Sequence, residues 1–522
     1  MVWRLRPLNG WPSLAPIVIS LLATLLSTFA VTGISFVLLD LREQLGISPM
    51  QVNLLRCTAI SSGLLIVFCA GSLCRRFGSR GCLSLSLLLW IAGSLLLAIH
   101  AGVLALALGL VLMGCADAGV RVSSYGMLLG GAEDDGQVAS LVSANTLATS
   151  LAFVGSPIIN SWILVRIDHG ATVVGLFWAI MFGLALFLLR LLVRPDPLPA
   201  AGPELQASTI PWMGLLAAGG FATLISTLPI LYAFNAGWVP AAIALAAGFA
   251  LVTARAWRRS SVIAAGFRFL GVRCLLLLLI ALALLFSMDY RYCAERFLAI
   301  RYQLDLADIS AWMTPASLAA ILASFGCAFA IPRFGMGRTL VIGILGCLIL
   351  PISFVLAPVQ VPIALIAAVT ASFAFSLTIV RVGLTSMVTA MTAKPLLANL
   401  EAVRHVLATS AWSLGSALAL NVLTAGFRKS LGEQLLPLAL PDVLSETITR
   451  MVASGHGRQV LQNGYGIPRD QLTSILGKNA APTLEAIMSV LHGMGWMILI
   501  MLILVTILII LSRSVAAPVA RP

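Results

Sequence analysis

The stretch AGSLCRRFGSR (Ala70–Arg80) places three arginines, with Gly78 among them, between two long apolar runs. A related stretch, AFAIPRFGMGR (Ala328–Arg338), follows, with Phe334 lying 257 residues after Phe77. Both contain Arg-Phe-Gly and a further arginine. The glycine gives the backbone freedom that a tight turn between two helices needs. Two copies of a helix–basic turn–helix unit at half-chain spacing predict an internally duplicated membrane protein.

The composition also indicates a membrane protein. Of 522 residues, 60% are hydrophobic and 10% are charged, against about 25% charged in an ordinary soluble domain. This excludes a soluble enzyme, a disordered chain and a nucleic-acid-binding module. The net charge of +13 fits Lys and Arg on the cytoplasmic side of a membrane protein better than binding to nucleic acid.

Fourteen apolar segments are long enough to be membrane helices, which need about 20 residues each. We predict an all-α polytopic protein with two six-helix halves and two extra central helices. The predicted spans are Pro16–Leu39, Leu54–Leu73, Leu83–Ile99, Leu104–Leu128, Ala139–Ile163, Val173–Leu192, Pro211–Phe234, Val239–Ala256, Val272–Met288, Ala307–Ile331, Leu340–Leu356, Val361–Thr392, Leu400–Leu423 and Glu485–Ser512.

These spans define the expected domains. Residues 1–194 form the N-terminal bundle, and residues 195–260 hold a linker and the two extra helices. Residues 261–424 and 484–513 form the C-terminal bundle, and 514–522 are a tail. Residues 425–483 are an insert in which two short amphipathic segments, each closed by a glycine, predict a helical hairpin. A tether with marginal helices is the alternative.

The distribution of basic residues predicts the orientation. With the N-terminus in the cytoplasm, cytoplasmic segments hold 17 Lys and Arg, and short outer loops hold 5. This bias predicts both termini inside and the insert outside. The N-terminal apolar run is too long for a cleaved signal peptide, so we interpret it as a retained span. The nine cysteines form no CxxC or Cys/His cluster, so we expect no metal site and no disulfide framework. We expect no cofactor.

Several motifs resemble those of the major facilitator superfamily, and most closely its fourteen-helix drug:proton antiporter branch (the EmrB/QacA type). They are Leu45-Gly-Ile-Ser48, the basic turn Gly71–Arg80, the segment from Pro211-Trp212 to Gly237-Trp238, and Arg404 with Gly415 and Ala417. The resemblance covers most of the chain. It implies a secondary transporter working by alternating access, and not an enzyme. It also implies conformational motif residues at Gly71, Arg75, Arg76, Gly78, Arg80, Pro157, Arg333, Gly335 and Arg338.

The chain departs from this family at several positions. An Asp of the basic turn, which pairs with another helix in the family, is replaced by Arg75. A first-helix Asp is replaced by Ala30, although Thr32 is kept. The fourth-helix Arg and Gln fall at Leu110 and Met113. The fifth-helix glycine motif becomes Ser156-Pro157 and Asn160-Ser161, and only Pro157 is clearly retained.

The charges that remain inside the spans are the candidate site. A charge at the bilayer centre costs about 2.5–3.5 kcal/mol or more, which makes such residues functional candidates. Asp117 and Arg121 lie one helical turn apart and can pair. Glu401 can pair with Arg404 or with His405. The candidate pathway residues are Thr32, Asp117, Arg121, Arg381, Glu401, Arg404 and His405.

These residues leave several functions open. The first is a proton-coupled exporter of the multidrug type, in which Asp117 or the titratable His405 carries the proton. The second is a transporter of an anionic or zwitterionic metabolite, in which Arg121 and Arg381 face one cavity and Arg381 binds the substrate. A membrane-embedded enzyme using the outer acidic residues Asp289, Glu295, Asp305 and Asp308, and a sensor or scaffold, are further alternatives.

The expected partners are a small-molecule substrate, a proton as coupling ion and the lipid bilayer. A periplasmic adaptor stays open, and nucleic acid is not expected. The expected location is a cell membrane, as a multi-pass protein of the bacterial inner membrane.

Overall fold

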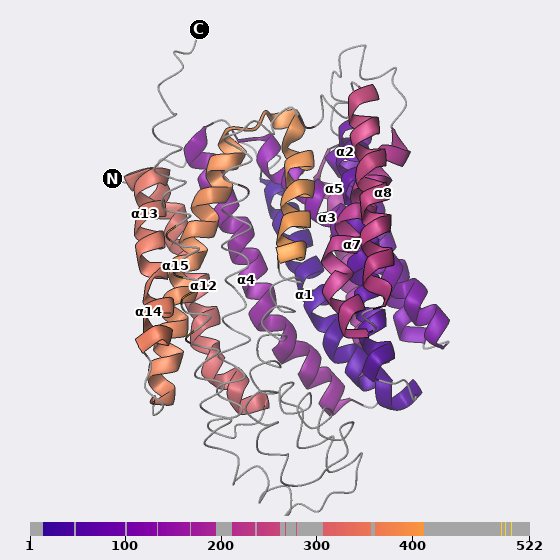
Figure 1. Ribbon diagram of the computed structural model, residues 1–522, viewed down its shortest axis with the longest axis horizontal. Helices are drawn as coiled ribbons and strands as arrows, with labels where there is room; N and C mark the ends of the chain where they lie inside the picture. Colours follow the sequence, from indigo (N-terminus) through magenta and orange to yellow (C-terminus); the bar gives the residue numbers. More distant parts are fainter. Residues whose placement is uncertain are drawn as a thin grey trace, which may run out of the picture. The chain divides into compact units, whose positions relative to one another are not determined.

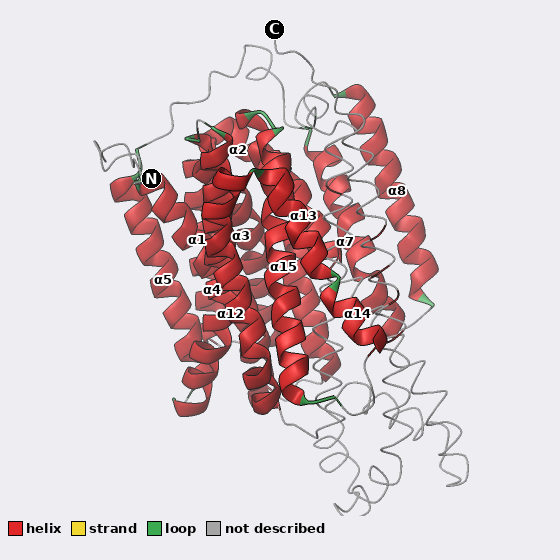
Figure 2. Ribbon diagram, turned by 90° about the vertical axis from the view of Figure 1, so that its left-hand side faces the viewer, coloured by secondary structure: helices red, strands yellow, loops and turns green. Residues whose placement is uncertain are grey.

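The computed structural model describes residues 14–45, 49–99, 102–132, 134–167, 169–194, 211–234, 237–260, 306–356 and 361–411, with isolated residues 267, 278, 492, 496, 499 and 503. These residues are helical apart from short turns (Figure 2). They belong to two compact units. The first unit is Met1–Leu278 with Ser324–Met336 and Val382–Ser410, and the second is Leu279–Ala323 with Gly337–Arg381 and Ala411–Pro522.

Helix α2 (Pro49–Ile99) is a hairpin with a single-residue turn. Its 51 residues would measure about 77 Å as one straight helix, far more than the roughly 30 Å of a bilayer core. Gly78 interrupts it with φ 78° and ψ 155°, a conformation essentially restricted to glycine. The basic turn therefore separates two membrane spans, as the sequence predicts, but the two helices continue up to the glycine on either side.

Helix α3 (Val103–Gly130) shows that the chain reverses at Gly78. It packs against both arms of α2. Along the second arm the partners run backwards: Gly109, Gly119 and Gly126 approach Gly93, Ser86 and Ser79. Along the first arm they run forwards: Gly114 approaches Ala59, while Ala118 and Val122 share a cluster with Val67, Ala70 and Cys74. The two arms are therefore antiparallel, and small residues allow the close packing.

The second copy of the basic turn has the same local geometry as the first. It joins α12 (Leu306–Phe334) to α13 (Met336–Cys347). Gly335 has φ 83°, close to the 78° of Gly78. In both copies the arginine before the phenylalanine lies over its ring at 5.7 Å, Arg76 on Phe77 and Arg333 on Phe334. The predicted repeat is therefore present in the backbone as well as in the sequence.

Three more helices complete the N-terminal core: α1 (Ala15–Leu45), α4 (Asp135–Arg166) and α5 (Gly170–Leu192). Trp90 of α2 stacks on Phe182 of α5, with ring centroids 4.7 Å apart. Ser156 of α4 donates a 2.7 Å hydrogen bond to the carbonyl of Phe29 in α1. Aromatic packing and buried hydroxyls thus hold five helical segments in one cluster.

Two further helices, α7 (Trp212–Phe234) and α8 (Trp238–Arg259), follow as a pair and lie side by side (Figure 1). Helix α7 packs on the first arm of α2, where Gly219 approaches the carbonyl oxygens of Leu64 and Leu65. Thr223 Oγ1 donates to the Ser61 carbonyl at 3.2 Å. Both helices coincide with segments that the sequence predicts to be helical, Pro211–Phe234 and Val239–Ala256.

In the second unit, α13 packs closely on α15 (Ile363–Ala390): Gly343 lies against Val380, and Gly346 against Ser376. The single span expected over Leu340–Leu356 is divided, because α13 ends at Cys347 and α14 (Ile349–Leu356) begins two residues later. Pro351 lies in the first turn of α14, where the missing N–H costs little. This boundary was not predicted.

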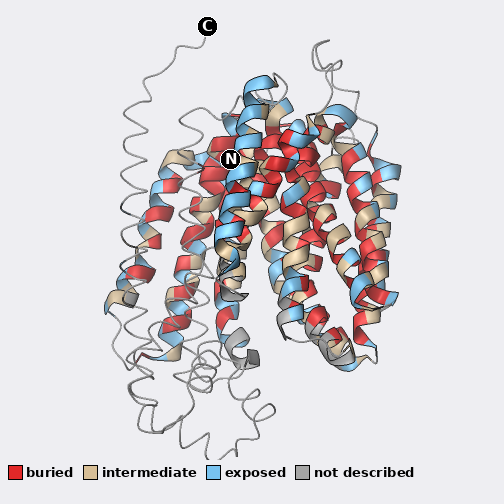
Figure 3. Cartoon of the chain, turned by 45° about the vertical axis from the view of Figure 1, so that its right-hand side comes forward, coloured by how far each residue is buried: buried red, intermediate tan, exposed pale blue. Residues whose placement is uncertain are grey.

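The exposed surface is strongly apolar. Leu104, Ile180, Met213 and Leu251 have exposed fractions of 85%, 69%, 82% and 72%. Buried and exposed residues alternate along each described helix (Figure 3). Within the described residues nine helices are long and apolar enough to cross a membrane, and one of them, Leu54–Ile99, contains both arms of α2. Such a surface suits contact with lipid and not with water.

Each predicted span that falls within the described residues is helical, and the helical residues 397–411 are the described part of Leu400–Leu423. The spans Val272–Met288 and Glu485–Ser512, the insert 425–483, the tail and the outer acidic residues Asp289, Glu295 and Asp305 lie outside the described residues, apart from isolated positions, whereas Asp308 lies in the first turn of α12. The count of fourteen, the orientation and the domain boundaries stay predictions.

Candidate functional site

Asp117 is the centre of the candidate site. It lies halfway along α3 and is buried, with an exposed fraction of 7%. Arg121 Nε donates to both oxygens of its carboxylate, at 2.9 and 3.0 Å. Ser27 Oγ of α1 donates a third hydrogen bond, at 2.6 Å. Three charge-assisted hydrogen bonds offset part of the cost of burying this carboxylate.

A second ion pair lies on the helical residues 397–411. The short 3-10 helix Lys394–Leu396, with a proline at its start, leads into this segment. Glu401 and Arg404 lie one turn apart and pair at 2.6 Å. Of the two pairings that the sequence left open for Glu401, the structure contains the one with Arg404.

Tyr125 joins the second ion pair to α3. The Arg404 guanidinium lies over its ring, 5.0 Å from the centroid. The Tyr125 hydroxyl and the Thr389 hydroxyl, on α15, are hydrogen-bonded at 2.7 Å. The bond joins residues 264 positions apart. Residues from both sequence halves therefore meet here, and all of them belong to the first compact unit.

The two ion pairs are close enough to influence each other. Arg121 interacts electrostatically with Glu401, and His405 with both Asp117 and Arg121. We call Asp117, Arg121, Glu401, Arg404 and His405 the charged cluster. With His405 neutral, the two arginines balance the two carboxylates, so the cluster has no net charge.

Two other predicted pathway residues have different surroundings. Thr32 Oγ1 donates to the Thr28 carbonyl within α1, at 2.8 Å. Arg381 lies on the part of α15 that belongs to the second unit, and it has an interaction partner. The hypothesis that Arg381 binds an anionic group of the substrate stays a prediction.

The residues of the first basic turn, Gly71–Arg80, pack on neighbouring segments of the first unit. Gly71 lies directly against Asn399, so a side chain at Gly71 would collide with it. Arg75 donates to Ser72 Oγ at 3.4 Å, and Arg80 donates to the Arg190 carbonyl near the end of α5, at 3.2 Å. The second of these contacts places a positive charge at a helix C-terminus, where the helix dipole favours it.

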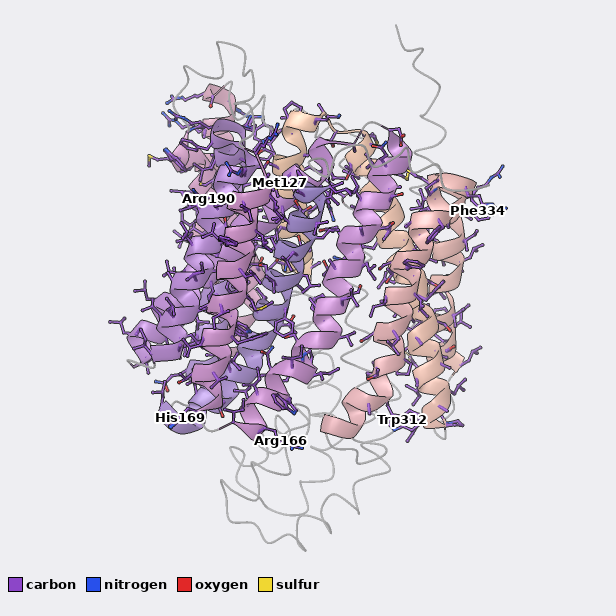
Figure 4. All side chains as sticks on the ribbon, turned by 180° about the vertical axis from the view of Figure 1, so that it is seen from behind. Met127, Arg166, His169, Arg190, Trp312 and Phe334 are labelled. Carbon is purple, nitrogen blue, oxygen red and sulfur yellow. The ribbon has the colours of Figure 1, made fainter. Side chains whose placement is uncertain are left out.

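Figure 4 places Arg190 and Met127 toward one end of the first unit, with Arg166 and His169 at the opposite end. Since Arg80 contacts Arg190, the basic turn belongs to the first of these ends. Of the remaining motif residues, Pro157 lies inside α4, and Arg338 is exposed near the start of α13.

Sequence reasoning missed three residues of this site: Ser27, Tyr125 and Thr389. Tyr125 had a detectable signal, because it lies one turn beyond Arg121 on the same face of α3. Ser27 and Thr389 are ordinary small polar residues in apolar helices. Only their long-range hydrogen bonds distinguish them.

A bundle of apolar helices with paired charges in its interior defines a polytopic membrane protein of the transporter class. The Major Facilitator Superfamily model matches residues 20–420, and the chain belongs to this family of secondary transporters, which are not enzymes. It is therefore a multi-pass membrane protein whose family acts on small-molecule substrates.

Solved structures with the same fold are only distantly similar in sequence. The human organic anion transporter MFSD10 (TETRAN) is 12% identical, with TM-score 0.56 and coverage of 92% of this chain and 99% of that chain. The proton:xylose symporter XylE is 16% identical, with TM-score 0.52 and coverage of 87% and 95%. FucP is 14% identical, with TM-score 0.51 and coverage of 84% and 96%. No curated protein matches the sequence.

Proposed function

We propose that the protein is a proton-coupled exporter of small molecules, with fourteen spans and both termini in the cytoplasm of a bacterial cell. The observation that carries this proposal is the buried Asp117 with its partners Arg121 and Ser27. A carboxylate at mid-membrane depth is energetically costly, so its presence there favours a functional role. An acid whose partner is a fixed cation can exchange that partner for a proton during a transport cycle.

The charge balance of the cluster favours a cationic or neutral substrate over an anionic one. Both arginines already have carboxylate partners, at 2.9 and 2.6 Å. A substrate anion would have to displace one of these carboxylates. A substrate cation would have to displace an arginine, but it competes with the proton for the same carboxylate, and this competition is the requirement for exchange. The multidrug type of export, suggested by the resemblance to the EmrB/QacA branch, fits this requirement, and an adaptor protein is not part of the proposal.

The test is transport by the purified protein in proteoliposomes with an imposed pH gradient. The substrates are cationic dyes, with neutral and anionic compounds in parallel. Asp117→Asn should lose gradient-driven transport, because the side chain no longer gains and loses a proton. Binding of a cationic dye should weaken as well, because the dye uses the same negative charge, whereas binding of a neutral compound should persist.

Asp134→Asn is the matched control. Asp134 accepts a hydrogen bond from the Gln137 N–H at the start of α4, at 2.7 Å, and Asn is an equally good helix cap. This variant should transport like the wild type. If Asp117→Asn keeps its full response to the pH gradient, the proposal fails; uptake of anions alone would restore the anionic alternative.

A further inference from the structure

We propose that Arg121 serves two carboxylates in turn: it binds Asp117 when that residue is ionised and turns to Glu401 when Asp117 holds a proton. Glu401 is then a positioning residue of the transport cycle, and not only the partner of Arg404. The proposal rests on the proposed function, since it assumes that Asp117 is the acid that takes the proton.

The geometry of Arg121 leaves it free for a second partner. Its hydrogen bonds to Asp117 both use Nε, so the two terminal nitrogens of the guanidinium are not needed for that pair. Ala402, next to Glu401, packs in one cluster with Ala118 and Val122 of α3, and this packing places Glu401 within electrostatic range of Arg121. A guanidinium has five N–H donors in a planar fork and can bridge two carboxylates.

Protonation of Asp117 would shift this balance. The proton removes the negative charge that holds Arg121, and Glu401 is the other acid facing it in the described cluster. The charged, titratable and polar groups that face one another here come from three segments. They are Ser27 of α1, Asp117, Arg121 and Tyr125 of α3, and Glu401, Arg404 and His405 of residues 397–411.

The shift has a structural consequence at Tyr125. Glu401 now holds Arg404 at 2.6 Å, and Arg404 in turn lies over the Tyr125 ring. When Arg121 competes for Glu401, Arg404 loses part of its hydrogen bond and its position over the ring. The contact of α3 with residues 397–411 weakens as a result. Protonation of Asp117 thus weakens a contact between the two sequence halves, because Arg121 and Arg404 both use the carboxylate of Glu401.

Hydrogen–deuterium exchange of the purified full-length protein tests this proposal. Asp117→Asn imitates the protonated state. It should raise the exchange of amides in residues 397–411 by about tenfold, the effect of one lost charge-assisted hydrogen bond. Peptides from α5 serve as the internal reference, and Asp134→Asn should leave both regions unchanged.

The variant Glu401→Gln tests whether Glu401 receives Arg121, as proposed, or has a purely structural role. In that background Arg121 has no second carboxylate, so adding Asp117→Asn should change exchange by less than about twofold, a strongly non-additive result. Glu401→Asp, which keeps the charge, should restore part of the response. If the two effects multiply, or if Asp117→Asn leaves residues 397–411 unchanged, the proposal is overturned.

Parallel transport assays keep the two proposals distinguishable. Loss of proton-driven transport in Asp117→Asn with unchanged exchange overturns the Arg121 proposal but supports the proposed function. Unimpaired transport refutes the proposed function itself. If Asp117→Asn does not fold, wild-type protein at acidic and alkaline pH gives the same comparison: exchange in residues 397–411, relative to α5, should rise at acidic pH.

Discussion

Gly114→Ala should destabilise the protein through a clash that no side-chain movement can relieve. Gly114 lies where α3 crosses the first arm of α2. A methyl group on it would collide with the Ala59 carbonyl oxygen and with Ser62 Oγ, and would lie 2.8 Å from the Ala59 carbonyl carbon. Two of these three atoms are backbone, so the helices themselves must move apart. Overpacking of this kind costs about 1–3 kcal/mol.

Gly183→Ala is the matched control, because Gly183 is also inside a helix but has open space around its Cα. Both substitutions gain about 1 kcal/mol of helix propensity. This gain cancels in the comparison, so the difference between the variants is the packing cost alone.

The assay is unfolding of the purified protein by SDS in mixed micelles, followed by circular dichroism. Gly114→Ala should be less stable than Gly183→Ala by about 1–3 kcal/mol. Equal stabilities would refute the close approach of α3 and α2, and with it the argument that the chain reverses at Gly78.

Three other predictions follow from the same structure. Gly78→Ala should cost about 1–3 kcal/mol through backbone strain, whereas Gly81→Ala, with ordinary contacts around it, should not; the same SDS unfolding measures both. Tyr125→Phe and Thr389→Val should show a coupling of about 1 kcal/mol in a double-mutant cycle, and additive effects would contradict their hydrogen bond. Arg166→Cys in a cysteine-free background should react with an impermeant maleimide in intact cells; reaction only after permeabilisation would invert the proposed orientation.

The sequence predicted those features that depend on local spacing. Asp117 and Arg121 pair because residues four apart share one face of a helix. Gly78 and Gly335 both have positive φ because each had to reverse the chain between two apolar helices. Hydropathy located each predicted span within the described residues, since a membrane helix has a minimum apolar length.

Local spacing and hydropathy do not predict contacts between residues that are far apart in the sequence. Ser27 and Asp117 are 90 residues apart, and nothing in the apolar helix around Ser27 marks it as a partner. The choice of Arg404 over His405 as partner of Glu401 depends on where α3 places Tyr125. The break between α13 and α14 was missed because apolar residues continue across it.

The contacts of helix α7 determine how this chain can be engineered. Besides its contacts with α2, its Ser226 hydroxyl is hydrogen-bonded at 2.7 Å to Ser410 in the C-terminal sequence half, and its Leu215 packs in a cluster with Cys69 and Val403. A helix that packed only at the edge of the bundle could be deleted without exposing buried residues. Helix α7 instead packs against segments from both sequence halves. Removing α7 and α8 would leave buried hydroxyls and glycine surfaces facing lipid. A variant without α7 and α8 therefore cannot be made from this chain by simple excision: the surfaces of α2 and of residues 397–411 would have to be redesigned together.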